Sequence, residues 1–204
     1  MPRAVAPARL TDRKRAAILE AAVAEFRASG YEATSMDRVA ASAGVSKRTV
    51  YNHFPSKEAL FTRIVEAMLE RGEGELALPY RADAPLREQL AELVRRKLRL
   101  MHEPDFVDLA RVAIAAGVQF PELARELLAR LGDREAGLVT WMRAAVADGR
   151  LKTKDPVFAA TQLEALVKGF AFWPQIAMGQ PPLTRARQKQ VADGTVEMFL
   201  ARYG

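Results

Sequence analysis

A run of basic and hydrogen-bonding side chains lies between Ser46 and Lys57. Within it, Arg48 and Asn52 stand four residues apart, so a helix would place them on one face. Arg and Asn carry the paired hydrogen-bonding groups that read guanine and adenine edges, and Lys, Thr and Tyr side chains suit phosphates. The pattern predicts a DNA-binding surface. The expected contact residues are Thr34, Ser35, Ser46, Lys47, Arg48, Thr49, Tyr51, Asn52, His53 and Lys57.

Two short helices joined by a tight turn are expected to position these side chains. Ser35 suits the N-cap of the first helix, and Ser46 suits the N-cap of the second. Gly44 between them fits the left-handed residue that ends a helix. Val50 and Phe54 give the second helix an inward apolar stripe, opposite Arg48 and Asn52. So short a turn makes the helices cross steeply, which is helix-turn-helix geometry with its second helix suited to the major groove.

The position of the cations supports this interpretation. Lys47 and Arg48 fall in the first turn of their helix, and Lys57 follows Ser56 at the start of the next one. Cations there oppose the helix dipole by roughly 0.3–1 kcal/mol each. They make sense where an anion is to be bound. The alternative is a solvated basic face on a small helical bundle.

The signature resembles that of the TetR family of transcriptional regulators. The resemblance rests on Ser35-Met36-Asp37, on Ala43-Gly44-Val45-Ser46-Lys47, and on Thr49-Val50-Tyr51-Asn52-His53-Phe54 followed by Lys57-Glu58. It extends over about residues 10–70. The C-terminal half is similar to AcrR- or AefR-like regulators in its helix layout and at Phe120-Pro121-Glu122-Leu123. The resemblance implies a homodimer on palindromic operator DNA and a small-molecule inducer.

Composition excludes several classes of protein. The 204 residues are 50% hydrophobic and include no cysteine, so disulfides and zinc–thiolate sites are ruled out. No run approaches the roughly 18 apolar residues of a membrane span. The first ten residues lack the apolar region of a signal peptide and suggest a loose basic arm. We therefore expect a cytoplasmic protein without a membrane partner.

Positive charge is concentrated at the N-terminal end. Residues 1–57 hold 10 Lys and Arg against 5 Asp and Glu, whereas residues 58–204 hold 21 against 20. A basic module on a near-neutral body fits a phosphate-binding head. Within the body, the basic run Arg95, Arg96, Lys97 and Arg99 is expected to be a solvated face of its helix, because acidic residues alternate nearby. The alternative is a second nucleic-acid surface.

Catalysis finds little support. The two histidines are His53, in the expected recognition helix, and His102, beside Glu103 and Asp105. The His102 group could hold a metal, but adjacent residues do not share a helix face. There is no nucleophile elbow, phosphate loop or dinucleotide motif. We expect the protein to have no catalytic residue, metal or cofactor and not to be an enzyme.

The apolar periodicity predicts an all-α protein of two domains. Residues 1–56 would form a three-helix, helix-turn-helix DNA-binding domain, and residues 57–204 a larger helical domain for ligand binding and dimerisation. The expected helices cover about residues 12–29, the two of the motif, 56–71 with a stop at Gly72 and Gly74, 85–102, 104–117, 121–149 with a kink at Gly132-Asp133, 155–178 with a kink at Pro174, and 184–203.

The last two helices are expected to form the dimer interface. Residues 156–178 carry apolar side chains on more than one side, which calls for burial all round. Two such helices from each chain would make a four-helix contact with twofold symmetry. A charge at Phe170 or Phe199 should disrupt it. The alternative is a crowded core within one chain.

Large apolar side chains in the body suggest a ligand cavity. Methionines suit a cavity that adapts to different shapes, and Gln162 would be a polar anchor. The candidate lining is Met68, Val94, Leu98, Met101, Trp141, Met142, Gln162, Leu166 and Phe170. The implied inducer is a small apolar or aromatic molecule, and the alternative is a filled core.

Three functions remain open at this point. The favoured one is a repressor released from its operator by such a ligand. The second is a DNA-binding regulator without a small-molecule ligand, switched by a protein partner or not at all. The third is a helical-bundle enzyme with an accidental basic face.

Overall fold

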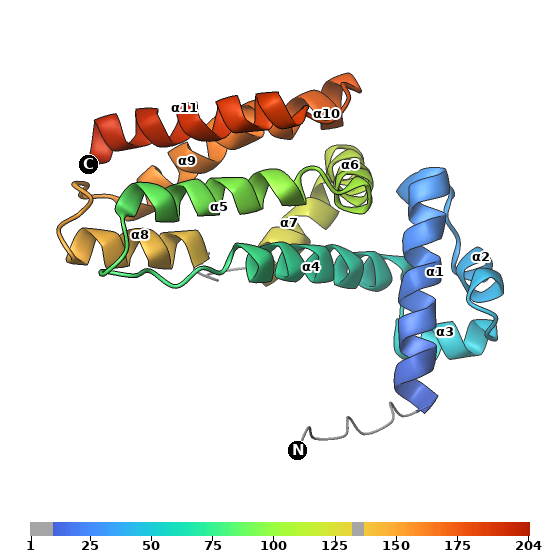
Figure 1. The fold of residues 1–204 in the computed structure, drawn as a ribbon. Helices are drawn as coiled ribbons and strands as arrows, with labels where there is room; N and C mark the ends of the chain where they lie inside the picture. Colours follow the sequence, from blue (N-terminus) through green and yellow to red (C-terminus); the bar gives the residue numbers. More distant parts are fainter. Residues whose placement is uncertain (1–9, 132–136) are drawn as a thin grey trace, which may run out of the picture. The chain divides into compact units, whose positions relative to one another are not determined.

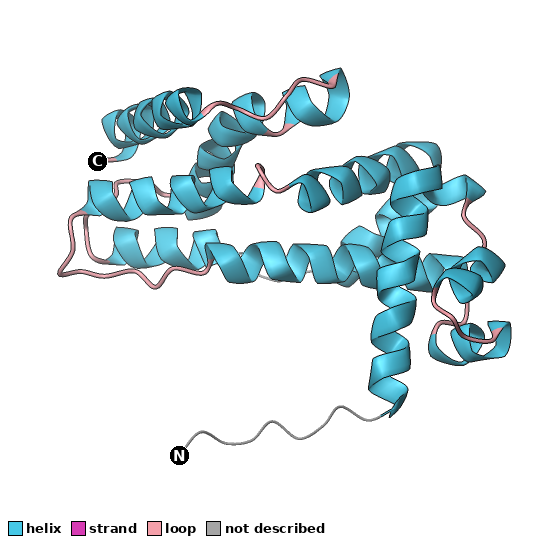
Figure 2. Cartoon of the chain, turned by 45° about the vertical axis from the view of Figure 1, so that its right-hand side comes forward, coloured by secondary structure: helices cyan, strands magenta, loops and turns pink. Residues whose placement is uncertain are grey.

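The computed structural model describes residues 10–131 and 137–204. This described part of the chain folds into helices and contains no strand, which confirms the all-α class (Figures 1 and 2). The expected basic arm and the expected kink at Gly132-Asp133 lie outside it. The described residues divide into two compact units: residues 10–67 with 112–130, and residues 68–111 with 131 and 137–204. The domain boundary after residue 56 stays a prediction. The first compact unit also contains residues 57–67 and 112–130, so it is larger than the predicted DNA-binding domain.

The first unit is built on the three helices of the expected motif. The helices that contribute to it are α1 (Leu10–Ala33), α2 (Met36–Ser42), α3 (Lys47–His53), the first part of α4 (Lys57–Leu76), the end of α6 (Pro104–Gln119) and α7 (Pro121–Leu131). Its core holds fully buried Ile18, Phe26, Val50 and Leu60. The Phe26 and Phe61 rings meet edge to face, with centroids 5.1 Å apart.

The capping predictions in this unit are confirmed. The Ser35 Oγ accepts a hydrogen bond from the Arg38 amide at 3.3 Å, and the Ser46 Oγ accepts from the Thr49 amide at 3.1 Å. Gly44 has a φ of 64° and ends α2 as expected. The first helix, expected to end at about residue 29, breaks at Gly30 with a φ of 76°, although a further helical turn follows it to Ala33.

The second unit is a helical bundle. It consists of the end of α4, the start of α6, α5 (Leu86–Leu100), α8 (Gly137–Ala147), α9 (Pro156–Ala171), α10 (Trp173–Met178) and α11 (Arg185–Tyr203). Helix α11 packs against α5 and α9, and α8 packs against α9 (Figure 1). Asp155 and Thr184 cap α9 and α11 through their side chains. The core of this unit therefore lies among α5, α8, α9 and α11.

One predicted helix end is wrong, and one predicted kink is present as a break. Helix α4 does not stop at Gly72 and Gly74 but runs on to Leu76. A Cβ atom at Gly72 would lie 3.2 Å from the Leu100 Cδ2, so this glycine allows close packing against α5 instead of ending the helix. The expected departure from a straight helix at Pro174 is present as a break at Phe172, because a proline lacks the N–H that would continue the helix.

Candidate DNA-binding interface

Helix α3 presents the expected reading residues to solvent. Arg48, Tyr51 and Asn52 are exposed, while Val50 is fully buried and Phe54 nearly so. The inward stripe thus fixes how the helix lies, and the capped N-terminus fixes where it begins. Among the described residues, no hydrogen bond or ion pair engages the Arg48 or Asn52 side chain. Both are available to base edges.

The N-terminus of α3 is held by a small polar cluster. The Ser46 and Thr49 hydroxyls lie 2.8 Å apart and share a hydrogen bond. Lys47 reaches back to α2, where its Nζ lies 2.7 Å from the Asp37 carboxylate. The hydrogen bond to Asp37 raises the pKa of Lys47. Lys47 is exposed beside the N-terminus of α3, a position that suits a phosphate.

Lys57 forms hydrogen bonds within the first unit. Its Nζ donates to the backbone oxygens of Tyr31 at 3.0 Å and Glu32 at 3.1 Å. It also lies 4.5 Å from the centroid of the Tyr31 ring. A cation at these carbonyls complements the negative end of the α1 dipole. This arrangement explains the lysine without DNA.

Thr34 is likewise engaged inside the protein. Only 2% of it is exposed, and its hydroxyl is within hydrogen-bonding distance of the Glu25 oxygen at 3.1 Å and the Gly30 oxygen at 2.8 Å. It secures the turn at Gly30. Ser35 and Ser46 are exposed, and His53 and Thr49 are half-buried on the flank of α3.

Arg38 was missed by the sequence reasoning. It lies on α2, is exposed, and pairs with Glu25 at 2.8 Å. An arginine in the first turn of α2 was the available signal. It adds a cation to the same motif.

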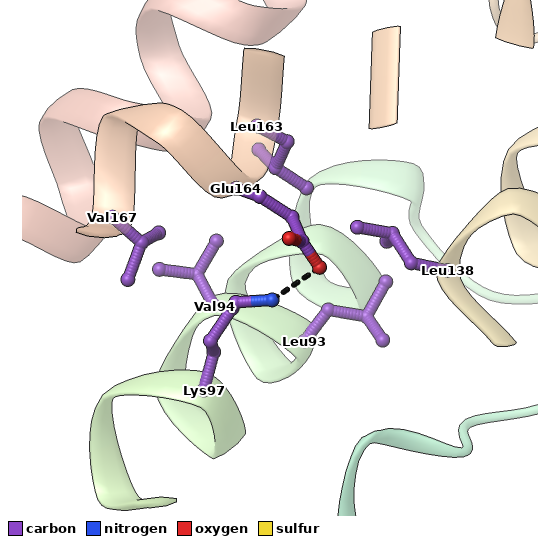
Figure 3. A pocket seen from close by; sticks show the side chains of 7 residues that line it. All are labelled: Leu93, Val94, Lys97, Leu138, Leu163, Glu164 and Val167. Atoms are coloured by element: carbon purple, nitrogen blue, oxygen red, sulfur yellow. Dashed lines mark hydrogen bonds and ion pairs between the residues drawn. The ribbon is translucent and has the colours of Figure 1, made fainter. Parts of the chain in front are cut away.

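The nine residues expected to line a ligand cavity do not meet in one place. Val94, Leu98, Met101, Trp141 and Met142 are buried, and Met68 is half-buried. Gln162, Leu166 and Phe170 instead line an open groove over α9 and α11. An interior cavity has a volume of about 20 Å³ (Figure 3). Of the nine predicted residues, only Val94 lines this cavity. Its lining is Leu93, Val94, Lys97, Leu138, Leu163, Glu164 and Val167.

Lys97 is the clearest misplacement by the sequence reasoning. We expected it on the solvated face of its helix with Arg95, Arg96 and Arg99, but it is only 8% exposed. Its position three residues after Val94 and four after Leu93 was the signal, because this spacing places it on the apolar stripe.

No helix in the described ranges is both long and apolar enough to cross a membrane. Those ranges also hold no group of three or more His, Cys, Asp or Glu side chains placed to bind a metal ion.

Comparison with known proteins identifies both parts of the chain. Residues 18–64 match the family described as bacterial regulatory proteins, tetR family. Residues 88–204 match the AefR-like transcriptional repressor, C-terminal domain.

Individual relatives are similar to this chain over most of its length. The transcriptional regulator RutR of Escherichia coli K12 is 31% identical over 173 residues, which are 82% of this chain and 79% of RutR. A TetR family regulator from Pseudomonas syringae pv. tomato DC3000 is 49% identical, with 95% of this chain and 98% of that one covered and a TM-score of 0.83. The flavonoid-responsive regulator FrrA is 33% identical, with 94% and 97% covered and a TM-score of 0.76. The chain belongs to the TetR family of DNA-binding transcriptional regulators, which are not enzymes.

Proposed function

We propose that the protein is a cytoplasmic homodimeric repressor that binds a palindromic operator through α3 and leaves it when a small, mostly apolar ligand binds. The observation that carries the DNA-binding part is the pair Arg48 and Asn52 on the capped helix α3, which is exposed and has no side-chain partner within the described ranges. In this role Arg48 and Asn52 read base edges, and Lys47 and Tyr51 contact phosphates.

The proposal of a homodimer is supported by exposed apolar side chains in the C-terminal helices. Helices α9, α10 and α11 carry them at an exposure of 47% or more. These are Val157, Phe158, Phe170, Trp173, Met178 and Met198. These helices pack against one another, and large exposed apolar side chains on neighbouring helices are typical of a contact site. A second copy is the fitting occupant, because a twofold dimer supplies the two heads that a palindrome requires.

The repressor and ligand parts are supported by the relatives. The C-terminal match is described as a repressor domain, and FrrA is named as flavonoid-responsive. Helix α4 belongs to both compact units, with residues 57–67 in the first and 68–76 in the second. A ligand that favours another arrangement of the second unit would act on α3 through this helix. Ordinary coupling of about 1–3 kcal/mol suffices for such a switch.

The test begins with a duplex selected from a random pool by the purified protein. Gel retardation that survives excess random DNA would support sequence-specific binding. Aromatic and amphipathic compounds found by thermal shift would then be titrated with and without the duplex. The proposal expects weaker ligand binding in the presence of operator, by the same factor as the ligand weakens the operator. Equal ligand affinity in both titrations would remove the switch, and retardation unaffected by every compound would favour a regulator without a small-molecule ligand.

A further inference from the structure

Two ammonium groups share one carboxylate in the second unit. The Lys97 Nζ on α5 donates to one oxygen of Glu164 on α9 (Figure 3). The other Glu164 oxygen accepts from the Lys168 Nζ at 2.9 Å. Lys97 is buried, Glu164 is half-buried, and Lys168 lies nearer the surface. With two positive groups and one negative group, the cluster carries a net charge of +1.

The charge imbalance falls on the buried member. Burial lowers the pKa of Lys97, and the attraction of Glu164 offsets this only in part. An ammonium out of water is stable only with good partners for its protons. Glu164 cannot serve Lys97 alone, because it also holds Lys168. Lys97 is therefore short of an anion.

Apolar space lies directly beside this ammonium. Leu93 and Val94 of α5, Leu138 of α8, and Leu163 and Val167 of α9 surround it (Figure 3). The cavity of about 20 Å³ has room for about one water. An anion's head group could enter here next to Lys97, and a hydrocarbon portion would extend among the side chains that line the cavity.

A buried donor without a partner lies on α8, the helix that contributes Leu138 to the cavity. Trp141 is 2% exposed, and its indole N–H has no hydrogen-bond partner among residues 10–131 and 137–204. It stands three residues after Leu138, which places the two on one side of the helix. Buried donors are nearly always paired in folded proteins, so an unpaired one calls for a reason. Trp141 is not part of the cavity lining, so a ligand would supply this reason only where an acceptor oxygen extends past Leu138 along α8.

We propose that this cluster is the anchor of the ligand site and that the ligand is an amphipathic carboxylate. The inference rests on the proposed ligand-responsive function and names the chemical class of the ligand. The ligand carboxylate pairs with Lys97, and Glu164 keeps Lys168. Each ammonium then has its own carboxylate, and the net charge of the cluster falls to zero. The hydrocarbon portion displaces apolar side chains and so favours a second arrangement of the unit.

The probes are pairs of nearly equal size and shape, in each of which a charged carboxylate is matched with its neutral amide. Octanoate is compared with octanamide, and 2-naphthoate with 2-naphthamide, by calorimetric titration of the full chain without DNA. At least one carboxylate should bind about tenfold or more tightly than its amide, as expected for a charge-assisted hydrogen bond at a buried site. Equal affinities within both pairs, or no binding of either carboxylate, would overturn the proposal.

Variants separate an anchor from a merely structural ion pair. Lys97→Met keeps the length of the side chain and should abolish the preference for carboxylates. Lys189→Met is the matched control, because Lys189 is an exposed lysine paired with Asp193 on α11, and it should leave the preference unchanged. Glu164→Gln releases Lys97 and should raise carboxylate affinity several-fold. Circular dichroism checks that each variant is folded, and lower carboxylate affinity in folded Glu164→Gln would contradict the anchor role.

The same proteins distinguish this inference from the proposed switch. Carboxylates that bind through Lys97 without changing operator affinity would leave the site standing and remove the switch. Operator release by a neutral compound, with Lys97→Met still responsive, would keep the switch and reject the carboxylate class.

Discussion

At the scale of single residues, the side chains of the motif divide by what already engages them. Arg48 and Asn52 are exposed and unengaged within the described part of the chain, whereas Thr34 and Lys57 are bound to backbone oxygens of the head. The sequence could predict the first pair from spacing alone. It could not separate the second pair from phosphate contacts, because a lysine or threonine near a helix end suits both roles.

Replacing Arg48 or Asn52 with alanine should relax base preference at one position in each half-site. The expected loss is about 1–3 kcal/mol of operator affinity, since each side chain can make a paired contact with one base. Binding to a panel of single-base operator variants measures it. Lys189→Ala on α11 is the control and should bind like the parent chain. A folded Arg48→Ala protein with unchanged base preference would show that α3 reads DNA through another face.

Lys57→Met should destabilise the fold more than it affects DNA binding. It removes two charge-assisted hydrogen bonds at the end of α1, for which a loss of about 1–3 kcal/mol is expected. Thermal unfolding measures this loss. The dependence of operator affinity on salt should stay nearly the same, because the lysine is already engaged. An unchanged melting temperature together with a salt slope lower by about one would instead make Lys57 a phosphate contact.

At the scale of helices, the apolar pattern predicted most elements but not which face of each is covered. Phe170 and Phe199 were both expected at the dimer interface, yet Phe170 is 48% exposed and Phe199 is 2% exposed within one chain. Lys97 was likewise expected on a solvated face, yet it is buried. Periodicity identifies a helix face, and only packing against other helices decides whether that face is core, interface or solvent.

The two phenylalanines therefore make a matched pair for the dimer. Phe170→Glu should give a folded monomer with weaker operator binding, because the charge blocks the contact between copies. Phe199→Glu should lower stability by several kcal/mol, because its charge would be buried in the core of one chain. Sedimentation and circular dichroism measure the two effects. A fully dimeric Phe170→Glu protein would exclude this residue from the interface.

The glycines of α4 offer a test of packing. Gly74→Ala should stabilise the protein by about 0.5–1 kcal/mol, because alanine favours a helix and its Cβ meets nothing within 4 Å. Gly72→Ala should gain less or lose stability, because its Cβ would lie 3.2 Å from Leu100. Thermal unfolding of both variants measures the difference. Equal gains would mean that Leu100 gives way freely at this contact.

At the scale of the whole molecule, the local rules of the sequence predicted the head better than the body. Capping serines and Gly44 act within a few residues, so their effect on α2 and α3 could be read directly. The body depends on contacts between distant segments, such as Lys97 with Glu164, which no local pattern reveals. Side chains expected to share one cavity are consequently divided between the interior and the open groove.

Operator architecture tests the central claim most directly. Duplexes selected by the purified protein should contain an inverted repeat whose half-sites lie about 34–36 Å apart or a multiple of that distance, since two copies of α3 must reach equivalent grooves. Sedimentation should find the chains bound in pairs, and deleting one half-site should remove most of the affinity. Selection of a single asymmetric site bound by one chain would contradict the account.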